Sequence, residues 1–252
     1  MIANLDENVG KVLDTLDRLG LAEDTLVCFM TDNGPALHDS VRHNAGLRDG
    51  KGSVYEGGLR VPFFARWTGH IAPGAEIAAM GAHIDVLPTL LDACGFTPPE
   101  EPRLDGVSLW PHLAGTATGA PDRTLFLQWH RGDAPEPFRN AAVVTRRFKL
   151  VNGAELYDLE ADPGEKNDVA ADHPDTVRRL RADYEAWFAD VGATRGYDPP
   201  RIVLGAPQEN PSVLTRQDWR GTAGWGDADN GGWEVRIAEG GDYRATVEVP
   251  KA

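Results

Sequence analysis

The chain has 252 residues, of which 41% are hydrophobic and 25% are charged, so it can bury a substantial core and is not disordered as a whole. Its two cysteines exclude a disulfide scaffold and most structural zinc sites. The 25 basic and 39 acidic residues give a formal net charge of -14. This charge argues against nucleic acids and anionic membranes as partners, and an anionic substrate would need a local positive site.

The first residues of the chain predict an amphipathic helix that ends at Gly20. Its apolar positions, at helical spacing, are Leu5, Val9, Val12, Leu13, Leu16 and Leu19. Asn4 and Glu7 resemble a capping box. Residues 25–30 then form a continuous apolar run, which predicts a strand buried on both faces, as in a parallel sheet. A helix followed by such a strand is typical of an open α/β sheet.

This predicted strand leads directly into the turn 31–34, whose sequence is Thr-Asp-Asn-Gly. Asp-Asn-Gly is a common turn sequence and is weak evidence by itself. In open α/β sheets, however, ligands bind beyond the carboxyl ends of the strands. A carboxylate beside an amide oxygen suits a hard cation such as calcium or magnesium. Asp32 and Asn33 are therefore candidate metal ligands.

Residues 35–58 are polar and rich in glycine and show neither helical nor strand periodicity, so we expect a long functional or disordered loop. Most lysines are solvated surface groups, but Lys51 lies between two glycines. Glycines let the backbone approach a ligand closely, and a lysine there can act as a point charge on a tetrahedral oxyanion. Arg48 and Arg60 could assist, although Arg60 could instead pair with Glu56.

Further elements follow in chain order. Residues 59–67 predict a strand in which Pro62 implies an edge or a bulge. A helix is expected around residues 86–93, capped by Asp85 and ended by Gly95. A connection rich in proline and glycine covers residues 96–122.

The rest of the chain predicts a small α+β subdomain and then a β hairpin. The subdomain has strands at 125–129, 141–145, 148–151 and 155–159 and a helix at 174–188 with Val177, Leu180, Tyr184 and Trp187 on its core face. The acidic residues of 155–175 are expected to form a solvated face. After a proline-rich linker from residue 196, segments 233–237 and 243–249 alternate apolar and polar residues around a Gly-Gly-Asp turn.

Taken in order, these segments resemble the sulfatase (arylsulfatase) family of the alkaline phosphatase superfamily over about residues 1–190. The matching stretches are 25–34, 44–53, 56–62, 83–91, 105–109, 149–151, 155–159 and 162–165. The resemblance implies hydrolysis of a sulfate ester. It implies that Asp32 and Asn33 match two ligands of the family's calcium ion, with magnesium less expected. It also implies that Lys51 matches the lysine that contacts the sulfate, as a catalytic and substrate-binding residue.

The family's nucleophile is a hydrated formylglycine, made from Cys or Ser in a Cys/Ser-x-Pro-x-Arg motif that this sequence lacks. Cys28 and Cys94 are outside such a motif, and both are expected to serve packing. The family's early Asp-Asp pair and its upstream histidine and lysine are also missing. We therefore expect the C-terminal part of a sulfatase, inactive alone, weak in calcium binding and prone to aggregate through exposed edges and an apolar face.

The expected fold class is a partial α/β sheet of the alkaline phosphatase type, followed by a small α+β C-terminal subdomain and the start of a β module. The predicted boundaries are 1–122, 123–195 and 196–252. No apolar run approaches the roughly 20 residues that span a bilayer. The residues after Met1 lack a signal-peptide pattern, so the periplasmic or secreted location that the family implies would depend on a segment before Met1.

Two rival functions remain open. The enzymatic rival is a phosphomonoester or phosphonate ester hydrolase of the same superfamily. The non-enzymatic rival is a degenerate or carbohydrate-binding protein with an aromatic platform of Trp219, Trp225, Trp233 and Tyr243. His130 could reach the substrate, but we slightly favour the interpretation that it is an ordinary loop histidine. The same two interpretations apply to His38 and His43. The partner expected is a small-molecule or carbohydrate sulfate ester, and neither the identity of the ester nor the oligomeric state can be read from the sequence.

Overall fold

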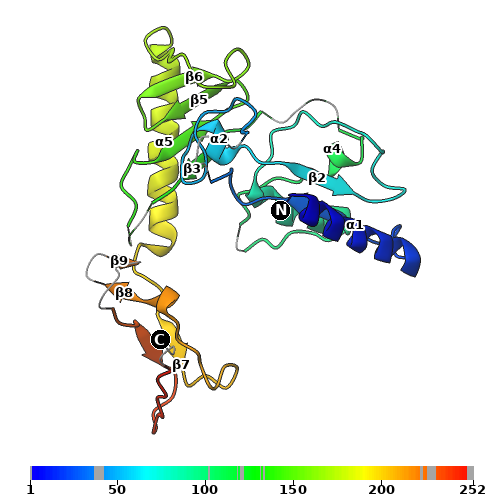
Figure 1. Ribbon diagram of the computed structural model, residues 1–252. Helices are drawn as coiled ribbons and strands as arrows, with labels where there is room; N and C mark the ends of the chain where they lie inside the picture. The colour runs from blue at the N-terminus through cyan, green and yellow to red at the C-terminus, as the bar shows by residue number, and fades with distance from the viewer. Residues whose placement is uncertain are drawn as a thin grey trace. The chain divides into compact units, whose positions relative to one another are not determined.

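We describe the protein from a computed structural model. The residues that it describes are 2–36, 43–101, 103–117, 119, 122–130, 132, 134–221, 224–225 and 231–248. The chain divides into two compact units (Figure 1), one of Met1–Gln128 with Asn140–Tyr184 and one of Trp129–Arg139 with Glu185–Ala252. The domain boundaries expected from the sequence stay a prediction.

The first unit begins with the predicted amphipathic helix, α1 (Ile2–Leu19), which ends at Gly20 with a φ of 68°. The predicted capping box is wrong, because Asn4 lies inside the helix, where its carbonyl accepts a hydrogen bond from Asn8 Nδ2 at 2.7 Å. No residue of α1 is buried, and its apolar side exposes Leu5 and Val12. The apolar stripe is therefore present but at most partly buried.

The strand after α1 is β1 (Val27–Met30), and it pairs with β2 (Phe63–Arg66), which starts directly after Pro62. The two strands are antiparallel and form a two-stranded sheet, so the expectation of a parallel strand buried on both faces is wrong for the described residues. Cys28 on β1 is exposed, and so is Cys94, contrary to the expectation that both serve packing. A sheet of two strands cannot cover both of its own faces.

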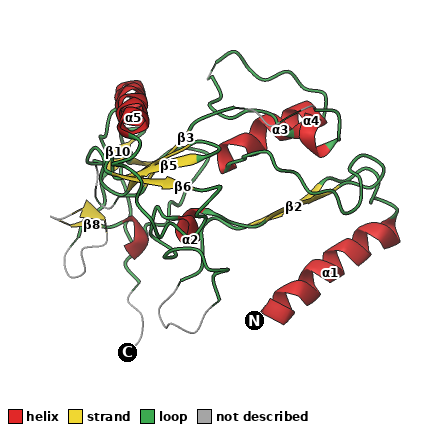
Figure 2. Cartoon of the chain, turned by 90° about the horizontal axis from the view of Figure 1, so that it is seen from above, coloured by secondary structure: helices red, strands yellow, loops and turns green. Residues whose placement is uncertain are grey.

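Helix α1 lies beside β2, as Figure 2 shows. Arg66 forms an ion pair with Asp17 at 3.1 Å, and Trp67 Nε1 donates a hydrogen bond to the Glu23 carbonyl at 2.6 Å. These polar contacts link α1 and the turn after it to β2 and the residue that follows β2.

The second predicted helix is confirmed as α3 (Val86–Ala93), preceded by the 3-10 turn η1 (His83–Asp85) and followed by Gly95 with a φ of 73°. Asp85 occupies the N-cap position but makes no side-chain capping bond to α3. Its carboxylate accepts instead from the backbone N–H groups of Ala82 and Val107. The connection expected at 96–122 contains one further helical turn, α4 (Trp110–Leu113), which the sequence did not predict.

A four-stranded antiparallel sheet completes the first unit, with strand order β3-β4-β5-β6. Its strands confirm the four predicted segments and are β3 (Leu125–Gln128), β4 (Ala141–Val144), β5 (Phe148–Val151) and β6 (Glu155–Asp158). The first part of α5 (Pro174–Arg195) runs alongside this sheet (Figure 1) and buries Leu180 and Tyr184. The core face of the helix was predicted correctly, whereas α5 continues seven residues past the predicted end at 188.

The second unit contains β7 (Ile202–Leu204), η2 (Arg216–Asp218), β8 (Arg220–Gly221), β9 (Gly224–Trp225) and β10 (Val235–Ile237). The predicted hairpin is wrong, because β10 pairs in parallel with β7 and residues 243–248 form no strand. Tyr243 Oη donates instead to the Glu239 carbonyl at 2.6 Å. Among the described helices of both units, none is long and apolar enough to cross a membrane.

Candidate functional site

The turn that follows β1 presents Asp32 and Asn33 at the end of the strand. Asp32 is exposed and Asn33 is partly buried. Asn33 Nδ2 donates a hydrogen bond to the Gly34 carbonyl at 2.9 Å, which orients the amide and leaves Oδ1 as its accepting atom. His83 Nε2 lies 2.9 Å from the Thr31 carbonyl and supports the same turn from η1. The turn therefore offers one carboxylate and one amide oxygen.

The loop that carries Lys51 folds back onto this turn. The Lys51 backbone N–H donates to the Pro35 carbonyl at 2.9 Å, and the side chain of Lys51 is exposed. Residues 51 and 35 are thus neighbours, although they are far apart in sequence. The structure brings the segments of Asp32, Asn33 and Lys51 side by side, and the roles of the three residues stay a prediction.

A single helical turn, α2 (Glu56–Leu59), binds both segments, and the sequence did not predict it. The Gly34 N–H donates to the Gly58 carbonyl at 2.9 Å, and the Gly57 N–H donates to the Arg48 carbonyl at 2.8 Å. A Cβ atom at Gly57 would overlap the carbonyl oxygens of the loop, and one at Gly34 would overlap the carbonyl of Gly57. Only glycine lets the three backbones approach this closely.

Arg48 is not placed to assist Lys51, whereas Arg60 is exposed and its role stays a prediction. Arg48 donates to Tyr157 Oη at 2.7 Å and to the Glu165 carbonyl at 3.1 Å, so it is engaged with the four-stranded sheet and the turn after it. Arg60 does not pair with Glu56, contrary to one alternative from the sequence. Glu56 Oε1 lies 3.0 Å from Lys149 Nζ instead.

Two tyrosines share a carboxylate beside this loop. Tyr55 Oη donates to Glu155 Oε2 at 2.8 Å, and Tyr157 Oη donates to the same oxygen. Burial, reinforced by Glu155, raises the pKa of Tyr55 to about 12 and also raises the pKa of Tyr157, while Arg48 opposes both shifts. Both phenols therefore stay protonated as hydrogen-bond donors at neutral pH.

Asp32 and Asn33 offer the type of oxygen ligand that a calcium ion prefers, but two residues are too few to complete its coordination. Calcium takes about six to eight oxygen ligands, from carboxylates, amides, carbonyls and water. Within the part of the chain that the structure describes, no group of three or more His, Cys, Asp or Glu side chains is placed to hold a metal. A cation bound here would need ligands from beyond these two residues.

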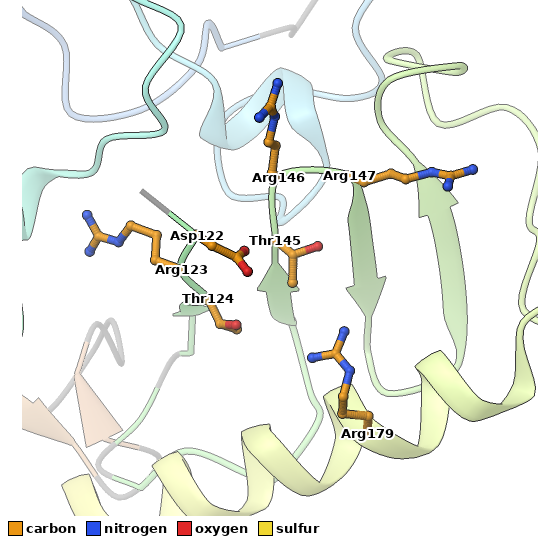
Figure 3. Close-up of a pocket in the computed structure, with 7 residues that line it drawn as sticks. All are labelled: Asp122, Arg123, Thr124, Thr145, Arg146, Arg147 and Arg179. Carbon is orange, nitrogen blue, oxygen red and sulfur yellow. The ribbon is translucent and has the colours of Figure 1, made fainter. Parts of the chain in front are cut away.

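A polar pocket of about 440 Å³ lies elsewhere in the first unit (Figure 3). Its lining includes four arginines, whose guanidinium groups point in different directions. Each has a carboxylate partner: Asp85 for Arg123, Glu160 for Arg146, Asp158 for Arg147 and Asp183 for Arg179. Because its positive charge is compensated, this pocket is a weaker anion site than its composition suggests, and none of the candidate residues lines it.

The remaining candidates add little to the site. His130 is exposed in the second unit, and its role stays a prediction. His43 is exposed at the start of the described loop, whereas His38 lies outside the described residues. In the second unit, the rings of Trp219 and Trp233 lie 5.7 Å apart between centroids, and the side chain of Trp225 lies outside the described residues.

The buried charged side chains beside α2 were not predicted from the sequence. Lys149 and Glu165 are at most 1% exposed, although both residue types are usually solvated. Glu165 also contradicts the expectation that the acidic residues of 155–175 form a solvated face. The sequence feature that pointed to Lys149 and Glu165 is the resemblance to the sulfatase family, because both residues lie in segments that match it, 149–151 and 162–165.

Known proteins resemble this chain in both sequence and fold. A family model described as Sulfatase matches residues 1–96. Human arylsulfatase A is 35% identical over 248 residues, covering 84% of this chain and 46% of that protein. An N-acetylgalactosamine-6-O-sulfatase of Bacteroides thetaiotaomicron is 32% identical, covering 71% of this chain and 39% of that protein.

A solved structure shares the fold of this chain. The crystal structure of Ps i-CgsB in complex with k-i-k-neocarrahexaose matches with a TM-score of 0.68 and 28% identity. The match covers 79% of this chain and 44% of that one. The chain thus spans less than half the length of these relatives. Over the part that it spans, it belongs to the sulfatase family of the alkaline phosphatase superfamily.

Proposed function

We propose that this chain is part of a calcium-dependent sulfuric ester hydrolase. In this proposal Asp32 and Asn33 supply oxygen ligands to the cation, and Lys51 binds the sulfate. The supporting observation is that, in a chain of the sulfatase family, the turn of Asp32 and Asn33 lies against the loop of Lys51, through the hydrogen bond from Lys51 N–H to the Pro35 carbonyl.

The chemistry of these groups suits a sulfate ester. When bound, the cation would draw negative charge from the sulfuryl oxygens and stabilise the charge that grows there during cleavage. The Lys51 ammonium is a point charge on a flexible stem and would bind the same oxygens. In a protein with a net charge of -14, such local positive charge is needed to hold an anionic substrate.

The nucleophile lies outside these residues, since the sequence contains no Cys/Ser-x-Pro-x-Arg motif. We propose that the formylglycine belongs to the part of a sulfatase that this chain does not span, and that the 252 residues alone are inactive. For the substrate we propose a carbohydrate sulfate ester. The relatives are named for different sulfatases, and the Ps i-CgsB structure holds a carbohydrate.

The test begins with the DNA upstream of Met1. We expect an in-frame segment that encodes Cys/Ser-x-Pro-x-Arg, and the protein extended by this segment should release sulfate from a sulfated sugar and from the chromogenic ester 4-nitrophenyl sulfate. Activity should exceed that on 4-nitrophenyl phosphate and disappear with a calcium chelator. Robust sulfate hydrolysis by the 252-residue chain, or a preference for the phosphate ester, would overturn the proposal.

Variants of the extended protein test the residues. Lys51→Met and Asp32→Ala should each lower kcat/KM by about 100-fold or more, as loss of a charge-stabilising group does in other enzymes. Lys166→Met and Asp105→Asn are matched controls, because both side chains are exposed and lie outside the site. Retention of full activity by Lys51→Met would remove Lys51 from the proposed site.

A further inference from the structure

A buried cluster of three charged side chains lies beside the candidate site and takes no part in the proposed chemistry. Lys149 is 0% exposed, Glu165 is 1% exposed and Glu56 is 9% exposed. Lys149 Nζ lies 3.0 Å from Glu56 Oε1 and 2.9 Å from Glu165 Oε1. The contact with Glu165 is an ion pair rather than a directed hydrogen bond, since Glu165 Oε1 has no hydrogen bond of good geometry.

Such a cluster is costly to bury, and apolar residues of similar size could fill the same space as stably. Burial raises the pKa of Glu165, and the facing Lys149 ammonium opposes that shift. A cluster of this kind is better explained by the geometry it imposes than by stability.

The cluster holds the turn that binds both segments of the candidate site. Glu165 Oε2 accepts the backbone N–H of Glu56 at 2.6 Å, while Lys149 binds the side chain of the same residue. Glu56 is the first residue of α2, and the next two glycines bond to the loop and to the turn after β1. Both ends of Glu56 are thus tied to residues of the four-stranded sheet and its following turn.

A second tie reaches the same loop from the same direction. The Arg48 guanidinium lies 3.7 Å from the centroid of the Tyr55 ring and donates to Tyr157 Oη and to the Glu165 carbonyl. Arg48 is three residues from Lys51, and its carbonyl accepts the Gly57 N–H at 2.8 Å. Glu165 is therefore common to both ties, through its carboxylate and through its backbone.

We propose that Lys149 and Glu165 are positioning residues: they hold Glu56 and α2, and thereby the backbone that carries Asn33 and Lys51, in the geometry of the site. The α+β part of the chain would then act on the site through buried charge, without touching the substrate. The functional meaning of this tether rests on the proposed function above, whereas the tether itself is a property of the chain alone.

Hydrogen exchange of the 252-residue chain tests the tether. In Lys149→Met, the amides of Gly34, Lys51, Gly57 and Gly58 should exchange about tenfold faster or more, while the amides of β3 and α5 keep their rates. Lys166→Met, an exposed lysine next to the cluster, is the matched control and should change neither set. Unchanged loop amides, or an equal acceleration of all amides, would overturn the proposal.

A second pair of variants covers the case in which Lys149→Met does not fold. Glu165→Gln keeps an oxygen that can accept the Glu56 N–H, whereas Glu165→Leu does not. Gln should therefore preserve slow exchange at Gly57 and Gly58, and Leu should lose it. Equal exchange in the two variants would show that the hydrogen bond to Glu56 does not hold the turn. Because the readout is amide exchange, this result is independent of whether the protein hydrolyses sulfate esters.

Discussion

The guanidinium of Arg123 lies 2.7 Å from the carboxylate of Asp85, a side chain that is only 1% exposed. The pair joins the start of the strand β3 to the start of α3. The same carboxylate accepts the backbone N–H groups of Ala82 at 2.7 Å and Val107 at 2.9 Å, so a single buried side chain fastens three segments of the first unit.

Replacement of Asp85 by Asn should lower the free energy of unfolding by about 3 kcal/mol, because a buried ion pair loses one partner. The amide would also place its NH₂ group against one of the backbone donors. Urea unfolding measures the change. Asp105→Asn, at an exposed position, is the control and should change stability by less than about 0.5 kcal/mol. Equal effects of the two substitutions would contradict the importance of the buried pair.

Two glycine substitutions should change stability in opposite directions. Gly57→Ala should destabilise the protein by about 1–3 kcal/mol, because its Cβ would overlap loop carbonyls that cannot withdraw without breaking their hydrogen bonds. Gly10→Ala meets no neighbouring atom inside α1 and should stabilise the protein by about 0.5–1 kcal/mol through helix propensity. Thermal unfolding should give a lower melting temperature for Gly57→Ala, and a higher one for Gly10→Ala, than for the parent chain.

The stability of the protein should fall as the pH rises from about 10 to about 12. The pKa of Tyr55 is about 12 in the folded state, above its ordinary value of about 10 in the unfolded chain. In that window the unfolded state loses its proton first, so deprotonation favours unfolding. Urea unfolding at several pH values should show a shallower decline in Tyr55→Phe than in the parent chain.

Tyr197→Phe removes the hydroxyl of an exposed tyrosine and is the control for this experiment. It should retain the parental dependence of stability on alkaline pH. If Tyr55→Phe and Tyr197→Phe decline alike, the hydrogen bond from Tyr55 to Glu155 does not govern the alkaline transition.

The 252-residue chain should self-associate through its exposed apolar side chains, which include Leu5 and Val12 of α1 and Phe64 of β2. The double variant Leu5→Lys/Val12→Glu leaves the net charge unchanged and should lower both light scattering and the binding of a hydrophobic dye. As a matched control, Glu7→Lys/Lys11→Glu exchanges the two members of an exposed ion pair on the same helix. A control that suppresses association as strongly would point to charge rather than to the apolar stripe.

Local patterns predicted most of the secondary structure. Helices α1 and α3, the four strands β3 to β6 and the core face of α5 follow from apolar spacing and from stop signals such as Gly20 and Gly95. The resemblance to the sulfatase family was also readable from the sequence, because its motifs are contiguous stretches of residues. For the same reason, Asp32, Asn33 and Lys51 could be named as candidates before their neighbours were known.

Pairing and burial were decided by the tertiary structure. The apolar run of β1 does not say that its partner is β2 in an antiparallel register, and the alternation around β10 does not point to β7. Nor does the sequence near Lys149 show that it meets Glu56, 93 residues away. A charged side chain is stable inside a protein only beside a partner of opposite charge, and that partner is supplied by the fold rather than by the neighbouring residues.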